Sequence, residues 1–190
     1  TTSNGNFLAL NNMRSANTID GNQMWLCGPG GLIYLNSAGS ATQVIPGSGA
    51  GSYNMRYCKI FNTTVSGSTQ SRFYFSTAPT AGPRGIYRVN NVGGAIPTTS
   101  GATATLVVTT GGTASNSGSS PYGFAVNGAE SIIYVADDGG NAAANKGIHK
   151  WTYNGSTWTE AYLFTNKIFK CLLSTNSYNL KIFLSITLLF

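Results

Sequence analysis

The chain has few charged residues. Only 8% of its 190 residues are charged, against roughly 25% in an average globular domain. Helical bundles and coiled coils need many Ala, Leu, Glu and Lys residues. This chain has too few of them, so its composition excludes both classes. Aromatic residues make up 12% of the chain, which is too many for an ordinary disordered segment. These features favour a folded domain whose surface carries mainly hydroxyl and amide groups.

Clusters of basic residues are also missing. The net charge is +6, but Arg56, Arg72, Arg84 and Arg88 stand singly and no run of Lys or Arg occurs. A surface that binds nucleic acid needs clustered cations, because affinity grows with the number of phosphates neutralised together. We therefore predict that nucleic acid is not a partner.

Cysteine and histidine are too sparse for a zinc site. The chain has three cysteines and one histidine, with no Cys-x-x-Cys pair. Cys27 and Cys58 lie in apolar, strand-like segments, which favours buried free thiols. A Cys27–Cys58 disulfide is the alternative if the protein is secreted, and spacing alone does not decide between the two.

A glycine-containing turn followed by a short aromatic strand occurs three times. The three copies are residues 19–27, 65–76 and 126–136. Each copy is followed by a second and a third apolar segment, at 31–35 and 42–45, at 85–89 and 103–108, and at 147–151 and 157–163. If Trp25, Tyr74 and Tyr134 are equivalent, the repeats are 49 and 60 residues apart.

Repeats of this kind are typical of β-propeller blades, which hold three or four strands in roughly 40–60 residues. A small twisted sheet cannot bury both of its faces alone, so such sheets stack face to face around an axis. No segment of residues 1–165 has helical periodicity with caps. We predict an all-β fold, a β-propeller fragment of about three blades at residues 6–50, 51–110 and 118–165. Each blade is expected to have three to four antiparallel strands joined by glycine-rich loops.

Four phrases of the sequence form a distinctive set. They are RSANTIDG at 14–21, YGFAV at 122–126, IYVADD at 133–138 and GIHKWTYNGSTW at 147–158. Together they resemble a broad group of secreted, uncharacterised β-propeller proteins from bacteria and some eukaryotes. The resemblance covers about Asn6 to Phe164 and implies a propeller fold and export from the cell, but no particular activity. Members of the group are longer, which implies that three blades here are part of a larger ring.

Two N-glycosylation sequons agree with an extracellular location. They begin at Asn62 and Asn154, and both have the Asn-x-Ser/Thr pattern. Such patterns arise readily by chance in a chain rich in Ser, Thr and Asn. They support the expectation that the protein is secreted without establishing it.

The C-terminal segment, residues 166–190, differs in composition from the rest. It has no glycine and contains six Leu, three Ile and three Phe. Its three lysines interrupt the apolar residues, so no uncharged run approaches the roughly 20 residues of a membrane span. We predict no membrane span and leave two origins open. The segment is either intron read-through or shifted-frame sequence, or the start of a next blade.

Asp137, Asp138 and Asn141 form the one acidic cluster, beside two glycines. Oxygen ligands of this kind suit a hard cation such as Ca²⁺. Asp and Asn next to Gly are equally typical of a simple turn, which is the favoured interpretation.

Trp151, Tyr153 and Trp158 surround the turn at Asn154. On a strand, Trp151 and Tyr153 point to the same face. Exposed rings could stack on sugars, whereas buried rings would pack between blades, and packing is the favoured interpretation. These three residues are the candidate ligand-binding set.

The sequence has no evident catalytic constellation. There is no Gly-x-Ser-x-Gly motif, and His149 occupies a strand position that corresponds to Tyr87 and Ile33, where we expect partial exposure. We predict no catalytic residues and no required cofactor. The function is expected to be that of a secreted, non-catalytic binding or scaffolding module with a glycan or protein partner. The alternative is a metal-dependent hydrolase, similar to lactonase propellers, with Asp137 or Asp138 as ligands.

Overall fold

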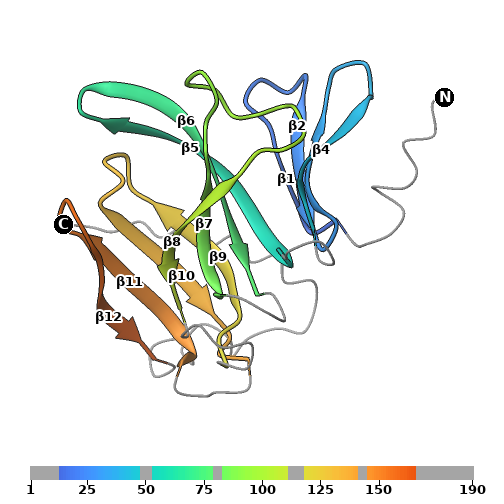
Figure 1. The fold of residues 1–190 in the computed structure, drawn as a ribbon. Helices are drawn as coiled ribbons and strands as arrows, with labels where there is room; N and C mark the ends of the chain where they lie inside the picture. Colours follow the sequence, from blue (N-terminus) through green and yellow to red (C-terminus); the bar gives the residue numbers. More distant parts are fainter. Residues whose placement is uncertain (1–12, 48–52, 79–82, 111–117, 141–144, 166–190) are drawn as a thin grey trace, which may run out of the picture.

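The chain folds into three antiparallel sheets (Figure 1). The computed structural model describes residues 13–47, 53–78, 83–110, 118–140 and 145–165. No α-helix occurs in these ranges, which confirms the all-β prediction. Sheet 1 consists of β1 (Ser15–Asn17), β2 (Met24–Gly28), β3 (Gly31–Leu35) and β4 (Ala41–Pro46). Sheet 2 consists of β5 (Met55–Val65), β6 (Ser68–Thr77), β7 (Gly85–Val89) and β8 (Ala104–Thr109). Sheet 3 consists of β9 (Pro121–Val126), β10 (Ile132–Asp137), β11 (Gly147–Tyr153) and β12 (Trp158–Phe164).

Each sheet is a meander in which every strand pairs with the next one in sequence. The repeats had indicated three strands per sheet most clearly, and the structure adds a first strand to each, namely β1, β5 and β9. Among these, β1 carries the weakest signal, because it has only three residues and a polar composition. The first strands lie next to one another, since β1 contacts β5 and β5 contacts β9.

The three aromatic residues taken as equivalent occupy the same register position. Trp25 pairs with Tyr34, Tyr74 pairs with Arg88, and Tyr134 pairs with Lys150. In each case the partner is the third residue after the glycine that begins the third strand. The repeats in the sequence are therefore repeats in the structure.

A glycine begins the third strand of every sheet because the fourth strand passes too close for a side chain. A Cβ atom at Gly31, Gly85 or Gly147 would lie 2.1, 2.0 or 2.2 Å from a carbonyl oxygen of the fourth strand. No real Cβ atom tolerates such a contact. These glycines fix where the third and fourth strands come together.

The first core lies between sheets 1 and 2. On β6 and β7 its members alternate along the strand, as Phe73 and Phe75 and then Tyr87 and Val89 do, which the period of two along a strand requires. The cluster comprises Trp25, Cys27, Leu32, Val44, Ile45, Met55, Cys58, Phe73, Phe75, Tyr87, Val89 and Ile96.

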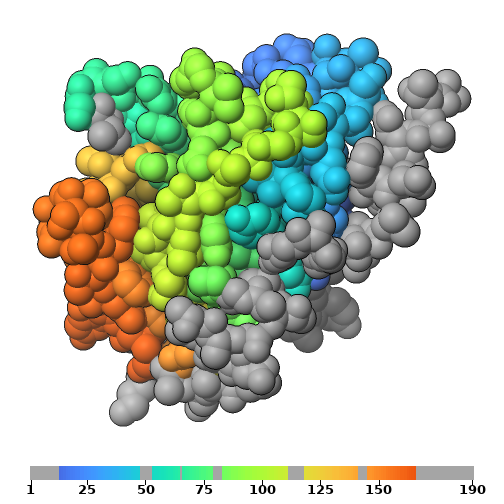
Figure 2. All heavy atoms as spheres, in the orientation of Figure 1, coloured from blue at the N-terminus to red at the C-terminus, as the bar shows by residue number. Residues whose placement is uncertain are grey.

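The second core lies between sheets 2 and 3. Tyr74, which stands between Phe73 and Phe75 on β6, points to this side. The cluster comprises Tyr74, Ile86, Val108, Phe124, Val126, Ile133 and Val135. Sheet 2 therefore buries both faces, which explains why β6 is apolar at consecutive positions near its end. The space-filling view shows the three sheets as adjoining blue, green and orange blocks (Figure 2).

Cys27 and Cys58 are free, fully buried thiols that meet across the first core. A hydrogen bond with the Cys58 thiol, together with burial, raises the pKa of the Cys27 thiol far above its usual value. The structure thus agrees with the free-thiol interpretation. No helix in the described ranges is long and apolar enough to cross a membrane, and residues 166–190 lie outside those ranges.

Candidate binding cleft

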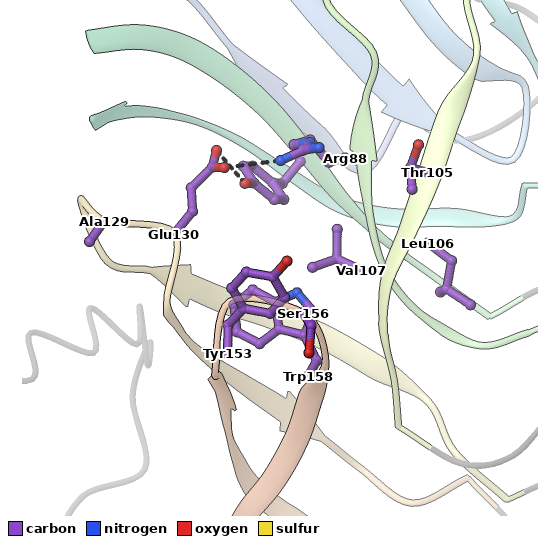
Figure 3. A pocket seen from close by; sticks show the side chains of 10 residues that line it. Arg88, Thr105, Leu106, Val107, Ala129, Glu130, Tyr153, Ser156 and Trp158 are labelled. Carbon is purple, nitrogen blue, oxygen red and sulfur yellow. Dashed lines mark hydrogen bonds and ion pairs between the residues drawn. The ribbon is translucent and has the colours of Figure 1, made fainter. Parts of the chain in front are cut away.

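A cleft of about 430 Å³ opens between sheets 2 and 3 (Figure 3). Strands β6, β7 and β8 form one wall, and the β9–β10 turn and the β11–β12 hairpin form the other. The lining residues are Tyr74, Arg88, Thr105, Leu106, Val107, Ala129, Glu130, Tyr153, Ser156 and Trp158. The lining combines aromatic, charged and hydroxyl-bearing side chains, which is the composition of a site for a polar organic ligand.

Two aromatic rings form one side of the cleft. Tyr153 and Trp158 are cross-strand partners in the β11–β12 hairpin, and their ring centroids are 5.1 Å apart. The Asn154 Oδ1 atom accepts hydrogen bonds from the backbone N–H groups of Ser156 and Thr157, which holds the hairpin turn in shape. Tyr153 is 37% exposed, so part of its ring is accessible to a ligand, whereas Trp158 also packs against the second core.

Glu130 provides the only carboxylate among the described lining residues. It sits in the β9–β10 turn with a φ of 50°, a left-handed conformation that is uncommon for a residue other than glycine. Its side chain reaches across to sheet 2 and is 10% exposed. The turn thereby ties sheet 3 to sheet 2, and a backbone hydrogen bond from Thr64 to Gly128 reinforces this link.

Four side chains of sheet 2 surround the Glu130 carboxylate. Oε1 accepts hydrogen bonds from the hydroxyls of Thr63 and Tyr74, at 2.9 and 2.7 Å. Oε2 accepts one from Arg88 Nη1 at 3.0 Å. The fourth, Arg72, lies with its Nε atom 3.7 Å from Oε1. Both carboxylate oxygens of Glu130 therefore accept hydrogen bonds from side chains of the protein itself.

Tyr74 is held as a neutral phenol in this network. Burial, and then its hydrogen bond to Glu130, raises the pKa of Tyr74 well above its ordinary value. Its hydroxyl therefore donates to the carboxylate over the whole physiological range.

The structure separates the aromatic trio that the sequence singled out. Tyr153 and Trp158 line the cleft, whereas Trp151 is half-buried against the second core. The indole Nε1 of Trp151 is buried and has no hydrogen-bond partner in the structure. Trp151 therefore belongs with inter-sheet packing.

The acidic cluster lies apart from the cleft. Asp137 is buried, and its oxygens accept hydrogen bonds from the Ser119 hydroxyl and the backbone N–H groups of Ser120 and Gly139. Asp138 is exposed and accepts a hydrogen bond from the Gly140 N–H group. Asn141 lies outside the described residues. In the described part of the chain, no three His, Cys, Asp or Glu residues are grouped so as to hold a metal.

The expectation that His149 is partly exposed is wrong. The His149 residue is 2% exposed, because it lies on β11 opposite Val135, a member of the second core. Ile33 and Tyr87 are also buried at their positions. The Nδ1 atom of His149 lies 2.6 Å from Glu160 Oε1, and its Nε2 lies 2.9 Å from the Asn145 carbonyl oxygen. Both ring nitrogens are occupied, so His149 braces the hairpin.

The two sequon asparagines are exposed. Asn62 lies on β5, where its Oδ1 accepts a hydrogen bond from the Ser71 hydroxyl. Asn154 lies at the hairpin turn beside the cleft. Both side chains are therefore accessible at the surface.

Glu130, Arg88 and Tyr74 were not identified as site residues from the sequence. Their meeting depends on how sheet 3 stacks on sheet 2, since Arg88 and Glu130 are 42 positions apart. The one available signal was the scarcity of acids, because Glu130 is one of only five in the chain. No protein-family model, curated protein or solved structure matches the chain.

Proposed function

We propose that the chain is a non-catalytic module of an extracellular β-propeller and that it binds a carbohydrate in the cleft between sheets 2 and 3. The observation that carries this proposal is the pair of adjacent rings, Tyr153 and Trp158, on the wall of a cleft lined with polar groups. The apolar C–H face of a sugar stacks on aromatic rings, while its hydroxyls need donors and acceptors around them. The exposed hydroxyl oxygens of Thr105 and Ser156 supply acceptors, because their protons are donated to the Oδ1 atoms of Asn90 and Asn154. Arg88, which also lines the cleft, supplies donors.

Binding is favoured over hydrolysis by the chemistry of the cleft. Glycoside hydrolysis usually needs two carboxyl groups that flank the scissile bond. Glu130 is the only carboxylate among the described lining residues, and both of its oxygens accept bonds from protein donors. The metal-dependent alternative rests on Asp137 and Asp138, but a cation at Asp137 would have to displace the bonds from Ser119, Ser120 and Gly139.

The propeller part of the proposal is supported by the arrangement of the sheets. Three four-stranded meanders repeat with the same register, and their first strands are neighbours. Sheet 2 is covered on both faces by sheets of its own kind. A stack of this type continues naturally into a ring. The extracellular location is supported by the low charge and by the exposed sequon asparagines.

A carbohydrate array with the purified chain tests the binding function, followed by calorimetry on each saccharide that is retained. Tyr153→Ala should weaken binding by about tenfold or more, since one stacked ring contributes on the order of 1–2 kcal/mol. Tyr162→Ala is the matched control, because Tyr162 is also an exposed tyrosine of sheet 3, at 59% exposure, but does not line the cleft.

Equal loss of affinity in both variants would show that the cleft is not the site. Absence of binding to any saccharide would refute the carbohydrate function. Circular dichroism of each variant establishes that the sheets remain folded.

A further inference from the structure

We infer that the saccharide taken by this cleft is acidic and that Arg88 binds its carboxylate. This inference rests on the proposed carbohydrate function and names the class of sugar. It follows from three features of the cleft: the unused donors of Arg88, the excess of positive charge around Glu130, and the position of Arg88 relative to the rings.

Arg88 has donor capacity that the protein does not use. A guanidinium group carries five N–H donors, and the structure assigns one of them, on Nη1, to Glu130. The Nε atom is buried without a hydrogen-bond partner. The side chain is 33% exposed and lines the cleft. Because Nε is buried, the donors that a ligand can reach are the remaining ones of the Nη nitrogens.

The charges around Glu130 do not balance. Arg72 and Arg88 both lie within ion-pair distance of this carboxylate, which gives two positive charges and one negative charge. Glu130 also accepts bonds from Thr63 and Tyr74, so its negative charge is shared among four groups. A second carboxylate, brought by a ligand, would complete the charge balance in a partly water-excluded site where such pairs are strong.

Arg88 and the rings face the same cavity from different walls. Figure 3 shows Arg88 on the sheet 2 side and Tyr153 and Trp158 on the hairpin side, with the cavity between them. A sugar ring stacked on Tyr153 would turn its substituents toward Arg88. An arginine fork matches a carboxylate geometrically, which a neutral hydroxymethyl group cannot exploit.

The experiment compares one saccharide in two charge states. Oligogalacturonate and hyaluronan oligosaccharides are the probes, each beside its own methyl ester, which keeps the ring and removes the charge. We expect at least one acid to bind about tenfold or more tightly than its ester, in keeping with the strength of charge-assisted hydrogen bonds. We also expect the difference to shrink as salt is raised.

Two variants distinguish a specific contact with Arg88 from the general attraction of an acidic sugar to a positively charged protein. Arg88→Gln and Arg72→Gln each remove one positive charge beside Glu130, but only Arg88 lines the cleft. Arg88→Gln should reduce affinity for the acid to that of its ester, whereas Arg72→Gln should leave most of the preference intact. An equal effect of the two variants would contradict the inference.

The outcomes distinguish a failure of the acidic preference from a failure of the proposed carbohydrate function. If acids and esters bind the wild-type chain equally, the carbohydrate function stands and the acidic preference is wrong. If neither the acids nor the esters bind while the array retains a neutral saccharide, the acidic preference is wrong and the carbohydrate function stands. If the array retains nothing, both fail. The comparison of acid with ester uses the wild-type chain, so it remains decisive even if Arg88→Gln does not fold.

Discussion

Glu130 is the residue on which the contact between sheets 2 and 3 most depends. It lies at the tip of the β9–β10 turn and engages three strands of sheet 2 through Thr63, Tyr74 and Arg88. A buried carboxylate is costly unless charged and hydrogen-bonded partners surround it, and here they do. The same residue therefore stabilises the fold and shapes the cleft.

Glu130→Gln should lower the free energy of unfolding by about 2–3 kcal/mol, because it leaves two arginines without their shared counter-ion. Urea unfolding measures this change. Asp20→Asn is the control: Asp20 is exposed and its carboxylate only accepts a turn hydrogen bond from Asn22, so an effect within about 0.5 kcal/mol is expected. A similar small effect for both variants would show that the Glu130 network adds little stability.

Calcium should not raise the melting temperature of the wild-type chain, because the oxygens of Asp137 are already bonded to protein donors. Asp137→Asn should destabilise the chain to the same extent with or without calcium. Thermal melts in calcium and in chelator check this expectation. A rise that Asp137→Asn abolishes would instead support the metal-dependent alternative.

Alkaline pH should destabilise the protein through three buried groups. Burial and the charge of Tyr53 raise the pKa of Tyr87 to about 12, and the pKa values of Tyr74 and the Cys27 thiol are raised further. A pKa raised on folding stabilises the fold fully below the unfolded-state pKa, which is roughly 8.5 for Cys and 10 for Tyr. That stability is lost as pH rises toward the folded-state values, because the unfolded chain then binds fewer protons than the folded one.

The free energy of unfolding should therefore stay flat up to about pH 8.5 and fall above it. Urea unfolding at a series of pH values measures the slope. Tyr74→Phe should make the fall above pH 10 shallower, since that variant has one fewer group to ionise. A stability that is unchanged from neutral pH to pH 11 would contradict the assignment.

At the scale of the strand, the repeated glycines are steric requirements. Gly85 has no neighbouring room for a side chain, since a Cβ atom would lie 2.0 Å from the Val108 carbonyl oxygen. Gly31 and Gly147 meet the same obstacle in sheets 1 and 3. The pairing of third and fourth strands depends on this close approach.

Gly85→Ala should destabilise the chain by about 3 kcal/mol or more, because backbone atoms must move to admit the methyl group. Gly123→Ala is the matched control in a strand, since nothing lies within 4 Å of the added atom there. Denaturant unfolding of the two variants gives the comparison. Equal stabilities would mean that the fourth strands shift freely.

At the scale of the whole molecule, each core belongs to two sheets. Cys27 of β2 and Cys58 of β5 meet in the first core, and the Ser15 hydroxyl and the Asn17 amide of β1 both donate to the Cys58 carbonyl oxygen. Neither thiol is accessible while sheets 1 and 2 are stacked.

Both thiols should resist a thiol reagent in native buffer and react together only when sheet 1 separates from sheet 2. Labelling rates at rising urea concentration measure the free energy of that separation. If it equals the free energy of global unfolding, the sheets unfold as one unit. A Cys171→Ser variant removes the third thiol of the chain. Rapid labelling of Cys27 and Cys58 in that variant under native conditions would show that the interface between sheets 1 and 2 opens independently.

The all-β fold and the repeat could be determined from the sequence. Alternating aromatic and β-branched residues specify strands locally. The glycines at positions 31, 85 and 147 mark the start of the third strand in every sheet. The recurring pattern of a glycine-containing turn and an aromatic strand predicts that Trp25, Tyr74 and Tyr134 are equivalent, and the register confirms it. Local patterns suffice for these features because strand and turn preferences act over a few residues.

Only the tertiary structure decided the cleft and the burial of its surroundings. Glu130 lies in a turn of sheet 3 and Arg88 on a strand of sheet 2. Local strand and turn preferences do not determine which turn of one sheet contacts which strand of another. The exposure of His149 and the separation of Trp151 from Tyr153 likewise depend on what the next sheet covers. Contacts between sheets arise from stacking whole faces together, and that information is spread over the chain rather than written in any one segment.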